Sequence, residues 1–361
     1  MPSPGRSSRA SAWESQPDTR GEKAEDGTET QRKGRRQRNV AWLTRRPKSQ
    51  TELASQFRDR VREAKASGQI LVLPGAYDGL SALMAERAGF EALYLSGAAY
   101  TASRGWPDLG IVTSTEIAER ARDLVRATGL PLLVDIDTGY GGILQVSRAA
   151  REMVEAQVAA VQIEDQELPK KCGHLNGKRL VSAQEMCEKI VAIKEVAPTL
   201  VVVARTDARA VEGVDSAIER AGLYAQAGAD AMFVEALESA EEFARVGRTV
   251  ELPLLANMTE FGKTPIVSAQ EFAAWGYSLV IFPVSALRVA ARAYGDLFEE
   301  IRRTGTQAGR IDRMQTRAEL YDTIDYYAYE ALDAHIARTV LPNRTARADG
   351  SSQEEGSDSL N

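Results

Sequence analysis

The sequence predicts an α/β fold, a (β/α)8 barrel, and two observations support this class. Short apolar runs rich in β-branched residues recur about every 25–35 residues, and each is followed by a longer stretch with helical spacing. There are eight such runs, which is the number of parallel strands that closes a barrel. The alternative, an open doubly wound sheet, is less favoured because no glycine-rich dinucleotide turn follows the first run.

The elements can be assigned in order along the chain. The predicted strands are QILVLPG (69–75), ALYLSG (92–97), PLLVDIDTG (131–139), AAVQIED (159–165), LVVVARTD (200–207), AMFVEA (231–236), PLLANMTE (253–260) and LVIFPVSA (279–286). The clearest helices are STEIAERARDLVRATG (114–129), AQEMCEKIVAIKEV (183–196) and VDSAIERAGLYAQAG (214–228). Gly89, Gly129 and Gly228 suit the left-handed residue that commonly ends a helix.

Composition limits the class of protein. The 361 residues, 43% of them hydrophobic, can bury a substantial core. No apolar run is long enough to cross a bilayer, and the N-terminus lacks the apolar stretch of a secretory signal. Cys172 and Cys187 do not form a disulfide framework, so each thiol is expected to be structural or catalytic. We therefore expect a cytoplasmic protein with no membrane partner.

Charge divides the chain into three parts. Residues 1–50 hold 12 Lys and Arg against 6 Asp and Glu, while the whole chain carries a net charge of −6. We expect a disordered basic arm at 1–52, a catalytic barrel with a C-terminal helical extension at 53–342, and a disordered tail at 343–361. The acidic residues between Glu14 and Glu29 argue against a transit peptide at the N-terminus. Nucleic-acid binding through RKGRRQR is not favoured, since a short basic run is usually a solvated tail.

Polar side chains follow almost every predicted strand. Any one of these polar residues could simply form a turn or cap a helix. That explanation is less favoured for the whole set, because it would have to apply independently after seven strands. In a (β/α)8 barrel the carboxyl ends of the strands meet on one face, where active sites are built. The sequence therefore predicts one site assembled from Ser96, Asp135, Asp137, Glu164, Asp165, Arg205, Asp207, Glu235, Asn257, Thr259 and Ser285.

The residue types indicate a metal and an anionic substrate. Asp135 and Asp137 are two apart on a strand and share a face, and Glu164 ends the neighbouring strand. Three carboxylates repel one another unless a cation lies among them, and oxygen ligands favour Mg²⁺, or Mn²⁺ as a substitute. Arg205 and Arg288 would then bind a small di- or tricarboxylate.

A further cluster lies in LPKKCGHLNG, residues 168–177. This stretch places one of only two cysteines and one of only two histidines, Cys172 and His174, beside Lys170 and Lys171. A buried inert cysteine is disfavoured, because so polar a segment would not form a core. Cys187, within a helical stretch, is interpreted as a packing residue.

These residues resemble the isocitrate lyase and phosphoenolpyruvate mutase superfamily over about residues 55–340. The resemblance rests on LYLSGAA, WPDLGI, LLVDIDTGYG, QIEDQ, KKCGH, ARTDA, EA, LANMTEFG, FPVSALR and MQTRAELY, in the expected order. It is greatest to the short lyases that cleave 2-methylisocitrate in the methylcitrate cycle of propionate catabolism. It implies a (β/α)8 barrel whose terminal helices swap between the subunits of a homotetramer, consistent with the long helical tail at 316–336.

The resemblance also implies a role for each matching residue. Asp135 and Asp137 would hold Mg²⁺, with Glu164 supporting through water, and Cys172 would be the general acid on a gating loop with Lys171 and His174. The implied catalytic residues are Cys172, His174, Lys171, Glu164 and Arg205. The implied substrate contacts are Ser96, Gly97, Ala98, Gly173, Arg205, Glu235, Asn257, Thr259, Arg288 and Arg317. Ala98 departs from the Ser-Gly-Gly stretch of relatives, but a backbone donor survives that change.

The implied reaction is a retro-aldol cleavage of 2-methylisocitrate to pyruvate and succinate. Neighbouring cations at Lys170, Lys171 and His174 would stabilise the thiolate that Cys172 leaves behind. Isocitrate and 2,3-dimethylmalate are alternative substrates. Oxaloacetate decarboxylation, phosphonopyruvate or phosphoenolpyruvate mutase-type chemistry, and a non-catalytic binding barrel are more distant alternatives.

Overall fold

The computed structural model describes residues 42–175 and 177–345. The disordered arm expected at 1–52 and the tail expected at 343–361 fall largely outside these residues. The strands are β1 (Leu71–Pro74), β2 (Leu93–Leu95), β3 (Leu132–Asp135), β4 (Ala160–Glu164), β5 (Val201–Thr206), β6 (Ala231–Val234), β7 (Leu254–Asn257) and β8 (Leu279–Phe282). All eight predicted strands are therefore confirmed.

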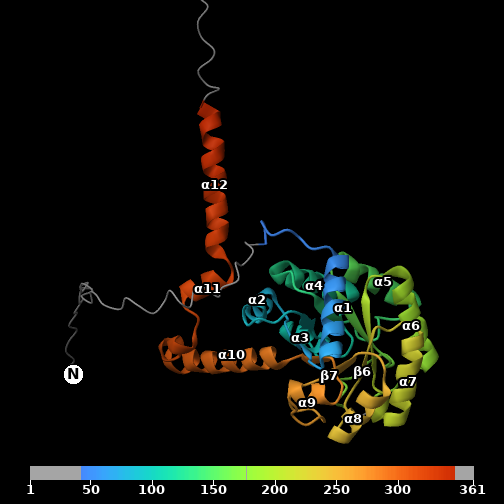
Figure 1. The fold of residues 1–361 in the computed structure, drawn as a ribbon. Helices are drawn as coiled ribbons and strands as arrows, with labels where there is room; N and C mark the ends of the chain where they lie inside the picture. The colour runs from blue at the N-terminus through green and yellow to red at the C-terminus, as the bar shows by residue number, and fades with distance from the viewer. Residues whose placement is uncertain (1–41, 176, 346–361) are drawn as a thin grey trace, which may run out of the picture. The chain divides into compact units, whose positions relative to one another are not determined.

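The strands form one parallel sheet in the order β1-β8-β7-β6-β5-β4-β3-β2. A parallel bridge between Gly75 and Tyr94 joins β1 to β2. This contact closes the sheet into the predicted (β/α)8 barrel, and Figure 1 shows helices around the strands. Leu133 and Val203, which alternate with residues of the other strand face, are fully buried, so the barrel interior is a packed core.

Helices lie between successive strands, as predicted, and further helices precede the first strand and follow the last. They are α1 (Gln50–Ser67), α2 (Gly79–Arg87), α3 (Gly97–Ser103), α4 (Ser114–Thr128), α5 (Ile143–Glu155), α6 (Ala183–Val196), α7 (Val214–Gln226), α8 (Ala240–Thr249), α9 (Ala269–Ala274), α10 (Ser285–Thr304), α11 (Arg317–Thr323) and α12 (Tyr326–Thr345), with short 3-10 turns η2 (Ala208–Ala210) and η3 (Ala308–Arg313). Gly89, Gly129 and Gly228 all have positive φ beyond a helix end, which confirms the predicted caps. No helix of the described residues is long and apolar enough to span a membrane.

Helix α1 covers the end of the barrel at which the strands begin. Gln50, Arg58 and Lys65 on this helix donate to backbone carbonyls just before β4, β5 and β7. The helix begins at Gln50, ahead of the domain boundary expected at residue 53, because Ser49 and Glu52 form a capping box. The opposite end of the barrel, where the strands finish, is left for the polar side chains.

The first described residues already contact the barrel. The Arg45 guanidinium donates to the carbonyls of Arg126, Ala127 and Thr128, and Lys48 donates to that of Gly129. These carbonyls end α4 and have no partner within that helix. Positive charge at a helix C-terminus is also favourable. Residues 45–49 thus stabilise α4 from outside it.

Candidate active site at the strand ends

Asp135 and Asp137 lie together where β3 ends. Asp135 accepts hydrogen bonds from the Gly97 amide (3.1 Å), the Asp137 amide (3.1 Å) and the Gln162 side chain (3.3 Å), so its carboxylate is fixed. Asp137 has a φ of 50°, in the left-handed region. A Cβ on Gly97 would lie 3.2 Å from Asp137 and 3.3 Å from Asp135, so both carboxylates converge at this glycine. The predicted pair is brought together and is almost fully buried.

Lys170 lies against this pair. Its ammonium group is 2.6 Å from Asp137 Oδ1 and 2.6 Å from Asp108 Oδ1. Burial alone would lower the pKa of Lys170, but Asp137, Glu164, Asp135 and Asp108 raise it well above its ordinary value. Burial raises the pKa of Asp137 to about 7, opposed by Lys170.

This position gives Lys170 partners that the sequence did not indicate. Its charge pairs with two carboxylates that are buried and would otherwise be unpaired, and its expected support of the Cys172 thiolate stays a prediction. Asp108 was missed as a site residue. It lies in the WPDLGI motif after α3, and that motif was the signal that could have identified it.

Arg205 connects three carboxylates at the ends of β4, β5 and β6. Its nitrogens lie 3.0 Å from Glu164, 3.0 and 3.2 Å from the two oxygens of Asp207, and 3.5 Å from Glu235. Burial raises the pKa of Glu164 well above its ordinary value, although Arg205 opposes the shift. Burial would lower the Arg205 pKa, but Asp207, Glu164 and Glu235 raise it. The guanidinium therefore stays charged in the site.

Two further predicted groups extend the cluster. The Asn257 amide nitrogen is 3.2 Å from Glu235, while its oxygen has no hydrogen-bond partner within the described chain. Arg288 lies 3.4 Å from the Thr259 hydroxyl and donates to Glu260 at 2.6 Å. These contacts bring Asn257 and Thr259 to the same end of the barrel as Arg205. Ser96 lies at the N-cap of α3, immediately before Gly97 and Ala98.

The KKCGH motif lies on a segment that packs against these strand ends. We call residues 166–180 the roof segment; residue 176 within it lies outside the described residues. A Cβ on Gly173 would be 2.4 Å from Glu235 Cγ and 2.6 Å from Arg205 Nη2, so only glycine allows this approach. His174 Nδ1 accepts from the Lys263 amide at 3.0 Å, and its Nε2 is 3.5 Å from Glu235.

The two cysteines differ as expected. Cys172 is exposed, which excludes a buried packing role, and it precedes the glycine that contacts Arg205 and Glu235. Lys171 is also exposed on the roof segment. Cys187 is partly buried against the core, and burial raises its pKa. The thiol available for chemistry is therefore Cys172.

Arg317 is the predicted contact that the chain does not bring to the cluster. It is exposed at the first residue of α11, whose contacts are with α2 and α12. Among the described residues no side-chain hydrogen bond or ion pair of Arg317 is found, apart from the backbone bonding of its helix. Its role as a substrate contact stays a prediction.

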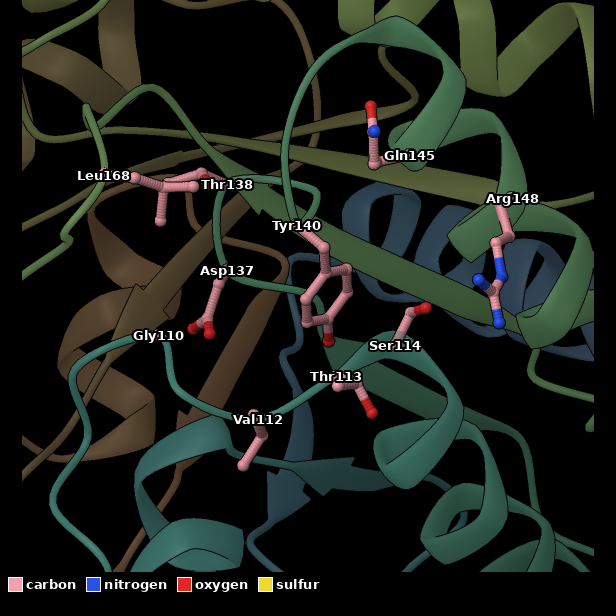
Figure 2. Close-up of a pocket in the computed structure, with 10 residues that line it drawn as sticks. All are labelled: Gly110, Val112, Thr113, Ser114, Asp137, Thr138, Tyr140, Gln145, Arg148 and Leu168. Atoms are coloured by element: carbon pink, nitrogen blue, oxygen red, sulfur yellow. The ribbon is translucent and has the colours of Figure 1, made fainter.

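A cavity of about 240 Å³ adjoins the Asp137 side of the site. In Figure 2 the Asp137 carboxylate and the Tyr140 ring project from one loop toward the segment that carries Gly110 and Thr113. The hydroxyls of Thr138 and Tyr140 are buried without a hydrogen-bond partner in the described chain. The cavity is lined by Gly110, Val112, Thr113, Ser114, Asp137, Thr138, Tyr140, Gln145, Arg148 and Leu168.

The carboxylates fit a hard divalent cation. Across residues 42–175 and 177–345, no three Asp, Glu, His or Cys side chains are gathered closely enough to form a complete ligand set. Mg²⁺ does not require one, because it is often held by one or two carboxylates and completes its shell with water and substrate. Asp135 and Asp137 supply such a pair, and the buried Lys170 ammonium shows that four carboxylates create a strong demand for positive charge there.

The chain is similar to known proteins over most of its length. Residues 61–302 match the family model described as phosphoenolpyruvate phosphomutase. A 2-methylisocitrate lyase of Halalkalibacterium halodurans is 64% identical over 84% of this chain and 99% of that protein. A 2-methylisocitrate lyase of Bacillus subtilis is 60% identical over 84% of this chain and all of that protein.

Two solved structures place the fold among related enzymes. A crystal structure of 2,3-dimethylmalate lyase, a member of the phosphoenolpyruvate mutase and isocitrate lyase superfamily, matches with a TM-score of 0.74 and 35% identity over 79% of this chain and 95% of that one. A phosphonopyruvate hydrolase in complex with oxalate and Mg²⁺ matches with a TM-score of 0.69 and 27% identity, covering 77% of this chain and 98% of that one.

Proposed function

Because this chain belongs to the phosphoenolpyruvate phosphomutase family, within the isocitrate lyase and phosphoenolpyruvate mutase superfamily, we propose that it is the lyase that cleaves 2-methylisocitrate to pyruvate and succinate. One observation carries the proposal. The roof segment brings the residue next to Cys172 into contact with Arg205 and Glu235, beside the carboxylate pair. An acid on one side of a bound anion and a cation site on the other are what a retro-aldol cleavage needs.

The residues of the chain divide the reaction between them. Arg205, Arg288 and Asn257 would bind and orient the substrate's carboxylates. The substrate hydroxyl would give its proton to a carboxylate of the site, for which we propose Glu164, its oxygen becomes the ketone of pyruvate, and the electron pair of the broken C–C bond passes to the succinyl carbon. The Cys172 thiol gives its proton to that carbon and is left as a thiolate. Gly173, packed on Glu235, holds the segment close enough to exclude water.

We propose Mg²⁺ as the cofactor, held by Asp135 and Asp137, with Mn²⁺ as a substitute. When bound, it would supply positive charge that favours loss of the hydroxyl proton. The phosphonopyruvate hydrolase that shares this fold was solved in complex with oxalate and Mg²⁺, which supports the choice. Mg²⁺ and Mn²⁺ binding measured by calorimetry tests it; absence of binding to the wild-type chain would contradict it.

The substrate choice is tested by comparing kcat/KM on 2-methylisocitrate, isocitrate, 2,3-dimethylmalate and oxaloacetate. The methyl group at C2 distinguishes 2-methylisocitrate from isocitrate, and one methyl is worth about 10–200-fold in discrimination. We expect isocitrate to be cleaved slowly. Isocitrate as the best substrate would change the substrate but not the mechanism, whereas reaction of oxaloacetate or a phosphonate alone would refute the proposed chemistry.

We also propose a homotetramer in which the terminal helices contact another copy of the chain. No residue of α10 is buried, and Tyr294, Phe298 and Ile301 on this helix are 52%, 65% and 40% exposed. Their spacing places them on one helical face, which a second copy would cover. Light scattering should give four times the chain mass, with Phe298→Asp dissociating the assembly and Glu299→Gln leaving it intact. A wild-type monomer would contradict the proposal.

The remaining assignments concern the cell and the ends of the chain. We propose that the enzyme works in the cytoplasm, which is consistent with two cysteines that are both free. We keep the interpretation of residues 53–342 as the catalytic unit, extended at its start to include α1 and the residues that bind α4. Fractionation of the native protein tests the location.

A further inference from the structure

Two buried side chains, those of Gln166 and Lys178, hold the backbone on the two sides of Cys172. On one side, Gln166 accepts from the Lys171 amide at 3.0 Å and donates to the Lys171 carbonyl at 2.9 Å. On the other side, the Lys178 ammonium donates to the Gly173 carbonyl. Lys178 belongs to none of the predicted site residues, yet its side chain is only 1% exposed.

Lys178 also binds the carboxylate that orients Arg205. Its ammonium is 2.9 Å from Asp207 Oδ1, and Arg205 holds Asp207 through two nitrogens at 3.0 and 3.2 Å. Burial would raise the pKa of Asp207, but Arg205 and Lys178 lower it below its ordinary value, so the carboxylate is charged. The Asp207 amide donates to Asp165 at 2.9 Å, which fixes Asp207 on the barrel. One carboxylate therefore holds both a substrate-facing arginine and the roof segment.

The ends of the roof segment are anchored separately. Gln166 and Leu180 form an antiparallel bridge, and the Glu167 amide donates to the Arg179 carbonyl at 2.9 Å. Loss of the Lys178 ammonium would leave these contacts in place. It would release the Gly173 carbonyl, next to Cys172, while Gln166 would still hold Lys171.

We propose that Lys178 is a positioning residue for the proton donor: it ties the Gly173 carbonyl to Asp207 and so holds Cys172 in register with Arg205. This inference rests on the proposed function, in which Cys172 gives the proton. The energetic basis is that a charged donor buried between a carbonyl and a carboxylate forms strong hydrogen bonds that water cannot replace. A displacement of about 1 Å in a reacting group is enough to cost about 10²-fold in rate.

The chain offers a matched control in Lys194. This lysine also joins a backbone carbonyl to a carboxylate, being 3.1 Å from the Leu200 carbonyl and 2.5 Å from Asp230. Both partners lie just before a strand, at the end of the barrel remote from the site. Lys194→Gln therefore removes the same kind of contact from a place where Cys172 is not affected.

The test compares Lys178→Gln, Lys178→Arg and Lys194→Gln by steady-state kinetics and by amide hydrogen exchange of the unliganded protein. For Lys178→Gln we expect kcat to fall about 10²-fold with KM within about threefold, because Arg205 keeps its own contacts with Asp207 and Glu164. Exchange should rise at least about tenfold in residues 168–175 and stay unchanged in the strands. Lys178→Arg should recover much of kcat, and Lys194→Gln should change neither kcat nor exchange at the roof segment.

Three results would overturn the inference. They are a Lys178→Gln enzyme with wild-type kcat, an exchange increase spread evenly over the barrel, and a Lys178→Gln chain that does not fold while Lys194→Gln does. A wild-type chain that cleaves none of the candidate acids would refute the proposed function instead. In that case exchange at residues 168–175 still decides whether Lys178 holds the roof segment.

Discussion

The strand ends and the roof segment are held in different ways. At the strand ends, side chains from neighbouring strands bind one another, as Glu164, Arg205 and Asp207 do. On the two sides of Cys172, by contrast, side chains bind backbone, as Gln166 binds Lys171 and Lys178 binds Gly173. The first arrangement depends on the barrel, whereas the second depends on a few local contacts. The comparison indicates that changes at the strand ends should affect binding and chemistry together, whereas changes in the contacts on the two sides of Cys172 should affect chemistry alone.

The largest expected effect is at the strand ends. Asp137→Ala removes one of the two carboxylates proposed to hold Mg²⁺, and a bound cation contributes several kcal/mol, so kcat/KM should fall by more than about 10³-fold. Mn²⁺ binding by calorimetry should be lost as well, and excess metal should not restore activity. Asp215→Ala, an exposed carboxylate of α7, is the control. Retention of metal binding by the Asp137 variant would show that the ligands lie elsewhere.

The second effect concerns the thiol. Cys172→Ser keeps the volume but removes an acid of suitable strength, so kcat should fall by about 10²-fold or more. Because the strand ends are unchanged, binding of pyruvate with Mg²⁺, measured by calorimetry, should persist. Cys187→Ser should be close to wild type in both measurements. The opposite pattern in the two variants would mean that the wrong cysteine was chosen.

The third effect tests the fit between the two regions. In Gly173→Ala the added methyl would meet Glu235 and Arg205, so the roof segment would have to move away. We expect kcat to fall by about 10–10²-fold while Mn²⁺ affinity stays within about twofold. Gly222→Ala on α7 is the matched control, because a methyl there meets nothing within 4 Å. Equal kcat in the two variants would contradict a close fit in the active enzyme.

The smallest effect is in pH dependence. Burial lowers the pKa of His174 below its ordinary value, and Arg205 and Lys178 lower it further, while Glu235 opposes them. When the roof segment is released from the strand ends, His174 binds a proton more readily than when the segment is docked. Docking of the roof segment therefore weakens as pH falls through about 6.5 and is unaffected above that pH. Hydrogen exchange at residues 168–175, corrected for the intrinsic rate, should therefore rise a few-fold between pH 7 and 5. His174→Gln should lose this dependence; a variant that kept it would exclude the imidazole as its source.

Sequence alone predicted the strand ends better than the roof. The eight strands follow from the spacing of apolar runs, and Asp135, Asp137, Glu164 and Arg205 follow from their positions at strand ends. Asp108 and Lys178 could not be found in this way, because their contacts join loops whose relative position depends on the completed barrel. The pairing of Lys170 with Asp137 could not be predicted either, since the nearness of Lys170 to Cys172 in sequence says nothing about the direction of a long side chain. Helix α1 was likewise not assigned before the structure.

The attachment of Arg45 to the end of α4 has a practical consequence for protein fusion. Arg45 and Lys48 serve four carbonyls of residues 126–129 from a position ahead of α1. A truncated chain that begins at Gln50 would lose all of these donors and also the Ser49 cap of α1. It would still contain every strand and helix of the barrel. A tag or reporter domain is therefore better joined before Trp42, so that the segment between the fusion point and α1 remains native.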